Sequence, residues 1–128
     1  MSKYVDGFVL VVQKKNVNTY VKMAKGAGKM WKKLGALDYF ECVGDDLNPN
    51  TYGTKMLGFP KMIKLKKDET VWFSFITYKS KAHRDAVNKK VHAQMGKEME
   101  KHPEWKDMPM PWVMKKFAYA GFKAMVEY

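Results

Sequence analysis

The chain has 128 residues, 46% of them hydrophobic and 14% aromatic, which suits one domain over residues 1–128 and excludes a disordered polymer. No run approaches the roughly 20 apolar residues of a membrane span, and no signal-peptide core follows the start, so we expect a cytoplasmic protein without a membrane partner. The formal net charge of +11 comes from lysines spread along the whole chain, with Arg84 as the one arginine; this pattern is typical of a solvated surface and makes nucleic acid an unfavoured partner.

The first predicted elements are a strand and an amphipathic helix. Residues 4–13 are almost continuously apolar and β-branched, and both faces of this strand are apolar. Residues 16–34 repeat apolar side chains at helical spacing with lysines opposite, and Gly35 is placed to end this helix. Gly26 and Gly28 weaken the helix or allow another part of the chain to approach its backbone closely.

Two more strands and a long connection come next. Residues 37–43 alternate as a strand, and residues 47–60, rich in Asn, Pro, Gly and Thr, form a long connection. We expect a short extension over residues 61–65 and a strong strand over residues 70–78. Alternation gives each side of that strand three bulky side chains: Val71, Phe73 and Phe75 on one, and Trp72, Ile76 and Tyr78 on the other.

The last third predicts a helix and a closing strand. Ser80 caps a helix that Ala82, Ala86, Val87 and Val91 would hold against the sheet, with a break before a further turn over residues 94–100. Residues 102–111 carry three prolines and should be irregular, and residues 117–128 alternate as a strand. The order β-α-β-β-α-β predicts an α+β, ferredoxin-like fold with long loops.

The strand pattern also predicts a partner. Two helices can cover only one face of a four-stranded sheet, yet three of the strands are apolar on both faces, and soluble monomers expose apolar patches of only a few hundred Å². Pairing with a second copy through this face is the simplest solution, because twofold homodimers are the commonest oligomers. In the alternative, the long loops 47–60 and 92–116 fold over the same face.

Several separate motifs, in order along nearly the whole chain, resemble the YbaA-like family of unknown function. They are YVDGF (4–8), ECVGDD (41–46), FP (59–60), YKSKAHRDAVN (78–88), KDMP (106–109) and YAGF (119–122). The resemblance implies a dimeric α/β barrel, in which two ferredoxin-like chains press their sheets together. It implies no activity, because relatives in that superfamily range from cofactor-free monooxygenases to isomerases. Residues around 52–57 and 100–103 depart from the family pattern, so loop-borne function can differ.

Two carboxylates in predicted strands, Asp6 and Glu41, are candidate catalytic residues, because a charge is out of place there without a polar cavity or a partner. If both point into the barrel with Tyr39, Trp72 or Tyr78, these groups could bind or deprotonate a small ligand. The alternative is an edge position or a lysine partner.

The start of the second helix contributes two further candidates. His83 is a candidate ligand contact or proton shuttle, although its place in the first turn of the helix favours a surface or interface position. Arg84, as the sole arginine, is a candidate ligand-binding residue or half of a fixed ion pair, for instance with Asp45 or Asp46 across the dimer.

Metal and cofactor motifs are absent from the sequence. The three histidines lie nine and ten residues apart, which matches no zinc pattern, and Cys42 adds one possible ligand. There is also no phosphate-binding loop and no nucleophile elbow, so we expect neither a metal nor a cofactor. Two functions remain: binding of a small, partly apolar molecule, or cofactor-independent catalysis of the oxygenase or isomerase type, with Asp6, Glu41 or His83 as base.

Overall fold

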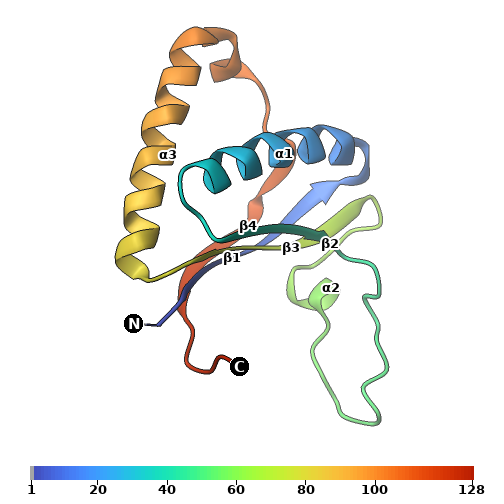
Figure 1. Ribbon diagram of the computed structural model, residues 1–128. Helices are drawn as coiled ribbons and strands as arrows, with labels where there is room; N and C mark the ends of the chain where they lie inside the picture. Colours follow the sequence, from blue (N-terminus) through green and yellow to red (C-terminus); the bar gives the residue numbers. More distant parts are fainter. Residues whose placement is uncertain (1) are drawn as a thin grey trace.

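The computed structural model describes residues 2–128, in which four antiparallel strands form one sheet beneath two long helices (Figure 1). The elements are β1 (Tyr4–Gln13), η1 (Lys14–Asn16), α1 (Val17–Lys33), β2 (Asp38–Val43), α2 (Phe59–Met62), β3 (Glu69–Tyr78), α3 (Lys81–Lys101), η2 (Pro103–Asp107) and β4 (Trp112–Lys123). The strand order is β2-β3-β1-β4, with antiparallel neighbours throughout. The predicted ferredoxin-like α+β fold is therefore confirmed.

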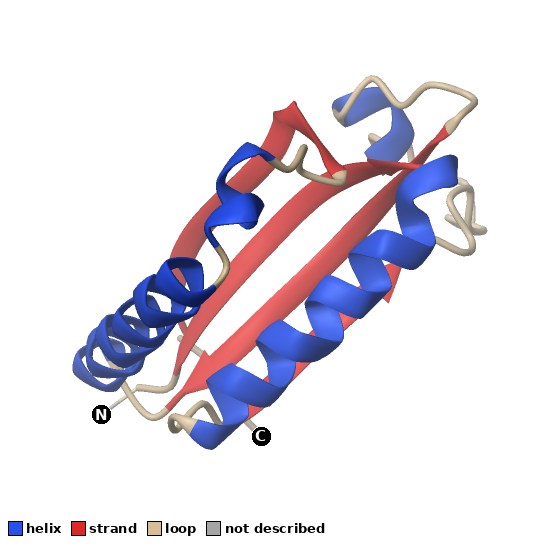
Figure 2. Cartoon of the chain, turned by 90° about the horizontal axis from the view of Figure 1, so that it is seen from above, coloured by secondary structure: helices blue, strands red, loops and turns tan. Residues whose placement is uncertain are grey.

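Helix α1 forms because its apolar side chains share one stripe over the sheet while its lysines face solvent. It ends at Lys33 with Leu34 as its C-cap, and the next residue, Gly35, has a φ of +124°, a left-handed conformation that glycine adopts without steric strain. Figure 2 shows α1 and α3 over the same face of the sheet. The predicted end of this helix is confirmed.

The core lies between the sheet and these helices, in two neighbouring clusters of buried side chains. One contains Ala36, Ile76, Tyr78, Val87 and Val91. The other contains Leu10, Val12, Tyr20 and Trp72. Alternation along β1 and β3 sends these side chains to one face, as the sequence predicted.

Helix α3 runs unbroken to Lys101, so the predicted break near residue 94 is wrong. Ala82 and Ala86, expected to face the sheet, are exposed, whereas Val87 and Val91 are buried as predicted. The first half of α3 contacts the sheet through the face that Val87 and Val91 share, four residues apart, and Ala82 and Ala86 lie off that face. The second half of the helix rises away from the sheet (Figure 1). A continuous apolar stripe is therefore not needed to keep it helical.

Two boundaries near loops also differ from the predictions. Residues 61–65 are not extended; they form the end of α2 and a turn in which Lys64 has a φ of +51°. The last strand begins at Trp112 and ends at Lys123, not over residues 117–128. The register of β4 against β1 shifts between Leu10 and Val12, and this irregularity interrupts the side-chain alternation from which the strand was predicted.

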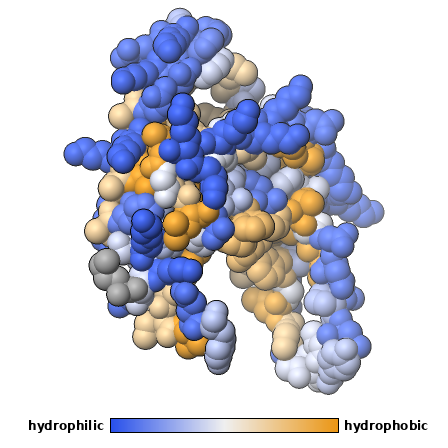
Figure 3. All heavy atoms as spheres, in the orientation of Figure 1, coloured by the Kyte–Doolittle hydropathy of each residue, from blue (hydrophilic) through white to orange (hydrophobic). Residues whose placement is uncertain are grey.

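The second face of the sheet is open except at one end, where Val11 and Val71 are buried. Phe40, Phe73 and Phe122 are 51%, 48% and 57% exposed, and Phe40 stacks on Phe75 with ring centroids 4.9 Å apart. Figure 3 shows the molecule hollowed below the sheet, between the C-terminal segment and the loop that follows β2. That loop covers one end of the face, where Leu47 lies close to Val71, and the segment after α3 lies on the helix side (Figure 1), so the alternative in which both loops cover the face is wrong.

Candidate functional site

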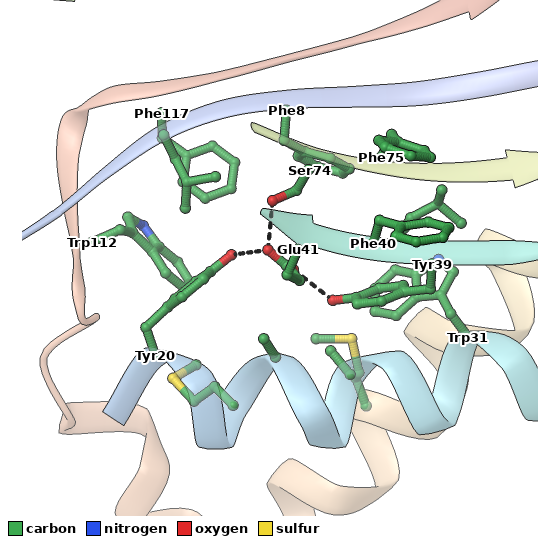
Figure 4. A pocket seen from close by; sticks show the side chains of 16 residues that line it. Phe8, Tyr20, Trp31, Tyr39, Phe40, Glu41, Ser74, Phe75, Trp112 and Phe117 are labelled. Atoms are coloured by element: carbon green, nitrogen blue, oxygen red, sulfur yellow. Dashed lines mark hydrogen bonds between the residues drawn. The ribbon is translucent and has the colours of Figure 1, made fainter. Parts of the chain in front are cut away.

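A carboxylate held by three hydroxyl groups lies between α1 and the sheet. Alternation along β2 turns Glu41 toward the helices, directly opposite Ser74 of β3. Its Oε2 accepts hydrogen bonds from the Tyr20 hydroxyl at 2.7 Å and from Ser74 Oγ at 2.6 Å, and its Oε1 accepts one from the Tyr39 hydroxyl at 2.8 Å. Figure 4 shows the two phenols reaching this carboxylate from α1 and from β2.

The carboxylate faces a cavity of about 220 Å³. Apolar and aromatic side chains from α1, α3 and all four strands line the cavity, including Phe8, Trp31, Trp112 and Phe117. Glu41 is the only charged side chain among the described residues that line it. Such a mostly apolar space with a few fixed polar groups is the usual composition of a small-molecule site.

The phenols beside Glu41 are protonated hydrogen-bond donors. Burial raises the pKa of Tyr20 and Tyr39 well above the ordinary value of 10.0, and the hydrogen bonds and negative charge of Glu41 raise it further. Both side chains therefore keep their protons at neutral pH, where they donate to the carboxylate and fix its position.

A close approach between α1 and β2 positions Tyr39. A Cβ placed on Gly28 would lie 3.0 Å from Cδ1 of the Tyr39 ring, so the missing side chain leaves room for this ring against the helix. Gly26 has no neighbour within 4 Å of the same position. Of the two glycines that the sequence singled out, Gly28 therefore permits the close approach.

A second hollow, of about 430 Å³, lies along the β2 edge of α1. It shares Tyr39 and Glu41 with the cavity, and its rim carries Lys25, Lys29 and Lys32. These three lysines are exposed, and in the part of the chain that the structure describes none forms an ion pair with Glu41. The carboxylate is thus reached from two sides.

The other predicted carboxylate, Asp6, belongs to a separate ion-pair cluster. Its Oδ1 lies 2.7 Å from Arg84 Nη1 and accepts a hydrogen bond from the Tyr119 hydroxyl at 3.1 Å. Burial acts to lower the pKa of Arg84, but the charge of Asp6, aided by Tyr119 and Asp85, raises it overall. Arg84 also lies over the ring of Tyr4, 4.9 Å from its centroid. The ion-pair partner of Arg84 is therefore within its own chain.

The remaining predicted site residues lie in the core or at a helix end. Trp72 is buried against Tyr20 and donates to Thr70 Oγ1 at 2.9 Å. Tyr78 is fully buried, and its hydroxyl accepts a hydrogen bond from Trp31 Nε1 at 3.1 Å. At the start of α3, Nδ1 of His83 accepts from the Lys79 amide at 2.9 Å.

The sequence reasoning missed two groups that hold Glu41. Tyr20 belongs to the apolar stripe that the sequence predicts for its helix, and its hydroxyl produces no sequence pattern of its own. Ser74 carried a usable signal, because it is a small polar residue on the face that Trp72 and Ile76 share. Of the predicted residues, only Tyr39 and Glu41 lie together at the cavity.

Neither a metal-binding cluster nor a membrane-spanning helix occurs among residues 2–128. Within residues 2–128, no group of three or more His, Cys, Asp or Glu side chains is arranged to hold a metal ion. Among the same residues, no helix has both the length and the apolar character that crossing a membrane requires.

Comparisons with known proteins place the chain among relatives of unknown function. The sequence profile of a protein family of unknown function, DUF1428, matches residues 3–112. The uncharacterized protein YbaA of Escherichia coli K12 is 35% identical over 127 residues, 98% of each chain, and YbaA of Shigella flexneri matches equally. The crystal structure of a dimeric ferredoxin-like protein from an uncultured marine organism covers 100% of both chains with a TM-score of 0.59 and 11% identity, a likeness of fold alone.

Proposed function

The chain belongs to the DUF1428 family of proteins of unknown function, and we propose that it is a homodimer in which each chain binds a small, partly apolar molecule between α1 and the sheet. The observation that carries this proposal is the cavity of about 220 Å³ whose aromatic walls surround one hydroxyl-anchored carboxylate, Glu41. A packed core would fill such a space with side chains.

The size of the cavity limits the ligand. A cavity of about 150 Å³ in another protein holds benzene, and most drug-sized ligands need roughly 300–1,000 Å³. About 220 Å³ therefore suits a molecule with one aromatic ring and a short substituent. Exposed Met23 and Met95 line the cavity from α1 and α3, so its opening lies between the two helices. Methionine side chains are flexible enough to let a ligand pass.

The first test fills the cavity from α1. Ala27→Leu adds volume inside it, and Ala86→Leu adds the same volume on the exposed face of α3 as a matched control. With phenethyl alcohol as a neutral, one-ring probe, we expect saturable binding to the wild type and to Ala86→Leu, and at least about tenfold weaker binding to Ala27→Leu. Equal binding to all three proteins, or no saturable binding to any, would refute the cavity as a ligand site.

The open face of the sheet supports the homodimer. Strands of 10, 10, 12 and 6 residues span a face of roughly 600 Å² in projection, since residues rise about 3.4 Å along a strand and strands lie about 4.8 Å apart. The chain itself buries the end of this face around Val11 and Val71, so the open part is smaller than a standard interface of about 800 Å² per partner, and its protruding phenylalanines suit a small dimer interface. The solved ferredoxin-like neighbour is itself dimeric.

The second test places a charge at the centre of this face. Phe73→Glu would bury a carboxylate in each half of the interface at a cost of several kcal/mol, so we expect the dissociation constant of the dimer to rise at least about 1,000-fold. Met99→Glu, on an exposed position of α3, is the control. Sedimentation equilibrium would contradict the dimer if the wild type were monomeric at micromolar concentration, or if Phe73→Glu paired as tightly as the control.

A second candidate function is cofactor-independent catalysis with Glu41 as the base. It is favoured by one observation: Glu41 is the only one of the three candidate bases that lines the cavity, whereas Asp6 is paired with Arg84. However, three hydroxyl groups already donate to this carboxylate, which leaves one acceptor position for a substrate proton. Catalysis predicts that Glu41→Gln abolishes turnover of an enolisable substrate that still binds; unchanged turnover would exclude this role.

A further inference from the structure

The charge balance around Glu41, which is half-buried, differs from that of Asp6 and Glu69, which are buried in the sheet. Asp6 has Arg84 at 2.7 Å, and Glu69 has Lys116 at 2.8 Å. Glu41 contacts only hydroxyl groups, and among the described residues no cation lies within ion-pair distance of it. In a chain with a net charge of +11, the missing cation leaves the carboxylate uncompensated.

We propose that the cavity binds a small organic cation, an ammonium group on a one-ring or similarly compact apolar frame, whose charge pairs with Glu41. This inference rests on the proposed function and names the class of its ligand. A ligand that fills the cavity removes water from half-buried Glu41. Burial of a carboxylate is costly unless an opposite charge accompanies it, and a bound ammonium supplies that charge.

The carboxylate keeps one place for this ligand. An ionised carboxylate offers about four acceptor positions, two on each oxygen. On Glu41 the Oε2 atom uses both, for Tyr20 and Ser74, and the Oε1 atom uses one, for Tyr39. The free position on Oε1 accepts an ammonium N–H, and the three hydroxyl groups keep the carboxylate from turning away.

The walls of the cavity suit a cation as well as an apolar ring. Aromatic side chains surround the carboxylate in Figure 4, among them Tyr20, Trp31, Tyr39 and Trp112. The faces of aromatic rings carry partial negative charge and attract ammonium groups, most strongly where water is excluded. The three lysines of the outer hollow lie on the other side of Glu41 and do not line this cavity.

The test compares three probes of nearly equal size at neutral pH: phenethylamine, which is a cation, phenethyl alcohol, which is neutral, and hydrocinnamate, which is an anion. We expect the amine to bind the wild type at least about tenfold more tightly than the alcohol, a difference of about 1.4 kcal/mol, and the anion to bind most weakly. Indole N–H signals in NMR spectra locate the binding: Trp31 and Trp112 should shift, and Trp105, outside the cavity, should not.

Two variants assign the preference to Glu41. Glu41→Gln should reduce the preference for the amine to less than about twofold. Asp38→Asn removes a charge from the same strand and should keep the preference for the amine. Asp38 lies on the open side of the sheet, where it accepts a hydrogen bond from Thr77 Oγ1. The comparison of probes on the wild type stands even if Glu41→Gln folds poorly.

Each outcome separates this inference from the proposed function. Equal binding of amine and alcohol, tightest binding of the anion, or an amine preference that survives in Glu41→Gln would overturn the cation assignment and leave the ligand site intact. If none of the three probes shifts Trp31 and Trp112, the proposed ligand site fails, and the cation assignment fails with it.

Discussion

Two glycines of α1 allow the contact between this helix and Tyr39 to be tested with a matched pair of substitutions. Gly26→Ala and Gly28→Ala remove the same conformational freedom from the same helix, and each should gain about 1 kcal/mol of helix stability. They differ in what the new methyl group meets. At Gly26 nothing lies within 4 Å of it, whereas at Gly28 it meets Tyr39 Cδ1 at 3.0 Å and Cε1 at 3.1 Å.

The contacts at Gly28 set the expected size of the effect. Distances of 3.0 and 3.1 Å force the ring of Tyr39 to move by a few tenths of an ångström, and overpacking of this kind costs about 1–3 kcal/mol. Gly28→Ala should therefore change the free energy of unfolding by between about 0 and −2 kcal/mol, after the helix gain is included. The two variants should differ by about 1–3 kcal/mol.

Urea denaturation followed by far-ultraviolet circular dichroism measures this difference. With an m-value near 2 kcal/mol per molar, the two midpoints should lie roughly 0.5–1.5 M apart, Gly26→Ala above the wild type and Gly28→Ala at or below it. Equal stabilisation by both variants would refute the close packing of Tyr39 on α1. Since the Tyr39 hydroxyl lies 2.8 Å from Glu41 Oε1, Gly28→Ala should also weaken probe binding.

Three further predictions concern the buried charges. Arg84→Met should lower the free energy of unfolding by about 3–5 kcal/mol because it leaves Asp6 buried without its partner; adding Asp6→Asn should recover part of the loss, and additive effects in urea denaturation would argue against the pair. Burial acts to raise the pKa of Glu69, but the hydrogen bond and charge of Lys116 lower it overall. The ionised Glu69 therefore stabilises the fold above its unfolded pKa near 4.3, and this stabilisation is lost as pH falls through the folded pKa. Glu69→Gln should thus flatten the acid side of the stability profile below about pH 4, and an unchanged slope would speak against this ion pair. The pKa of Tyr20 and Tyr39, the two phenols that donate to Glu41, is raised in the folded protein, so their contribution to stability is complete below the unfolded pKa near 10 and is lost as pH rises through the folded pKa. Glu41→Gln removes the charge that helps to raise these pKa values, so tyrosinate absorbance should appear at lower pH in this variant. An identical titration would contradict the effect of that charge.

The candidate site shows where sequence reasoning reached its limit. Charged residues inside apolar strands identified Asp6 and Glu41 as unusual, but the sequence could not tell which one faces a cavity. The structure separates them: Asp6 is satisfied by Arg84, and Glu41 is held by hydroxyl groups at the cavity. The choice depends on contacts between residues 21 to 78 positions apart, which no local pattern encodes.

Local physics determined most of the fold, and a resemblance of motifs indicated the family. Hydrophobic periodicity placed β1, α1, β2 and β3, the apolar second face predicted the open phenylalanines, and the order of motifs identified the YbaA-like resemblance, which the comparisons confirm. Only tertiary structure decided the start of β4, the unbroken course of α3 and the Glu41 network. Register shifts, helix tilt and buried hydrogen bonds depend on packing between segments that are distant in the sequence. The hydrophobic periodicity of one segment therefore cannot predict them.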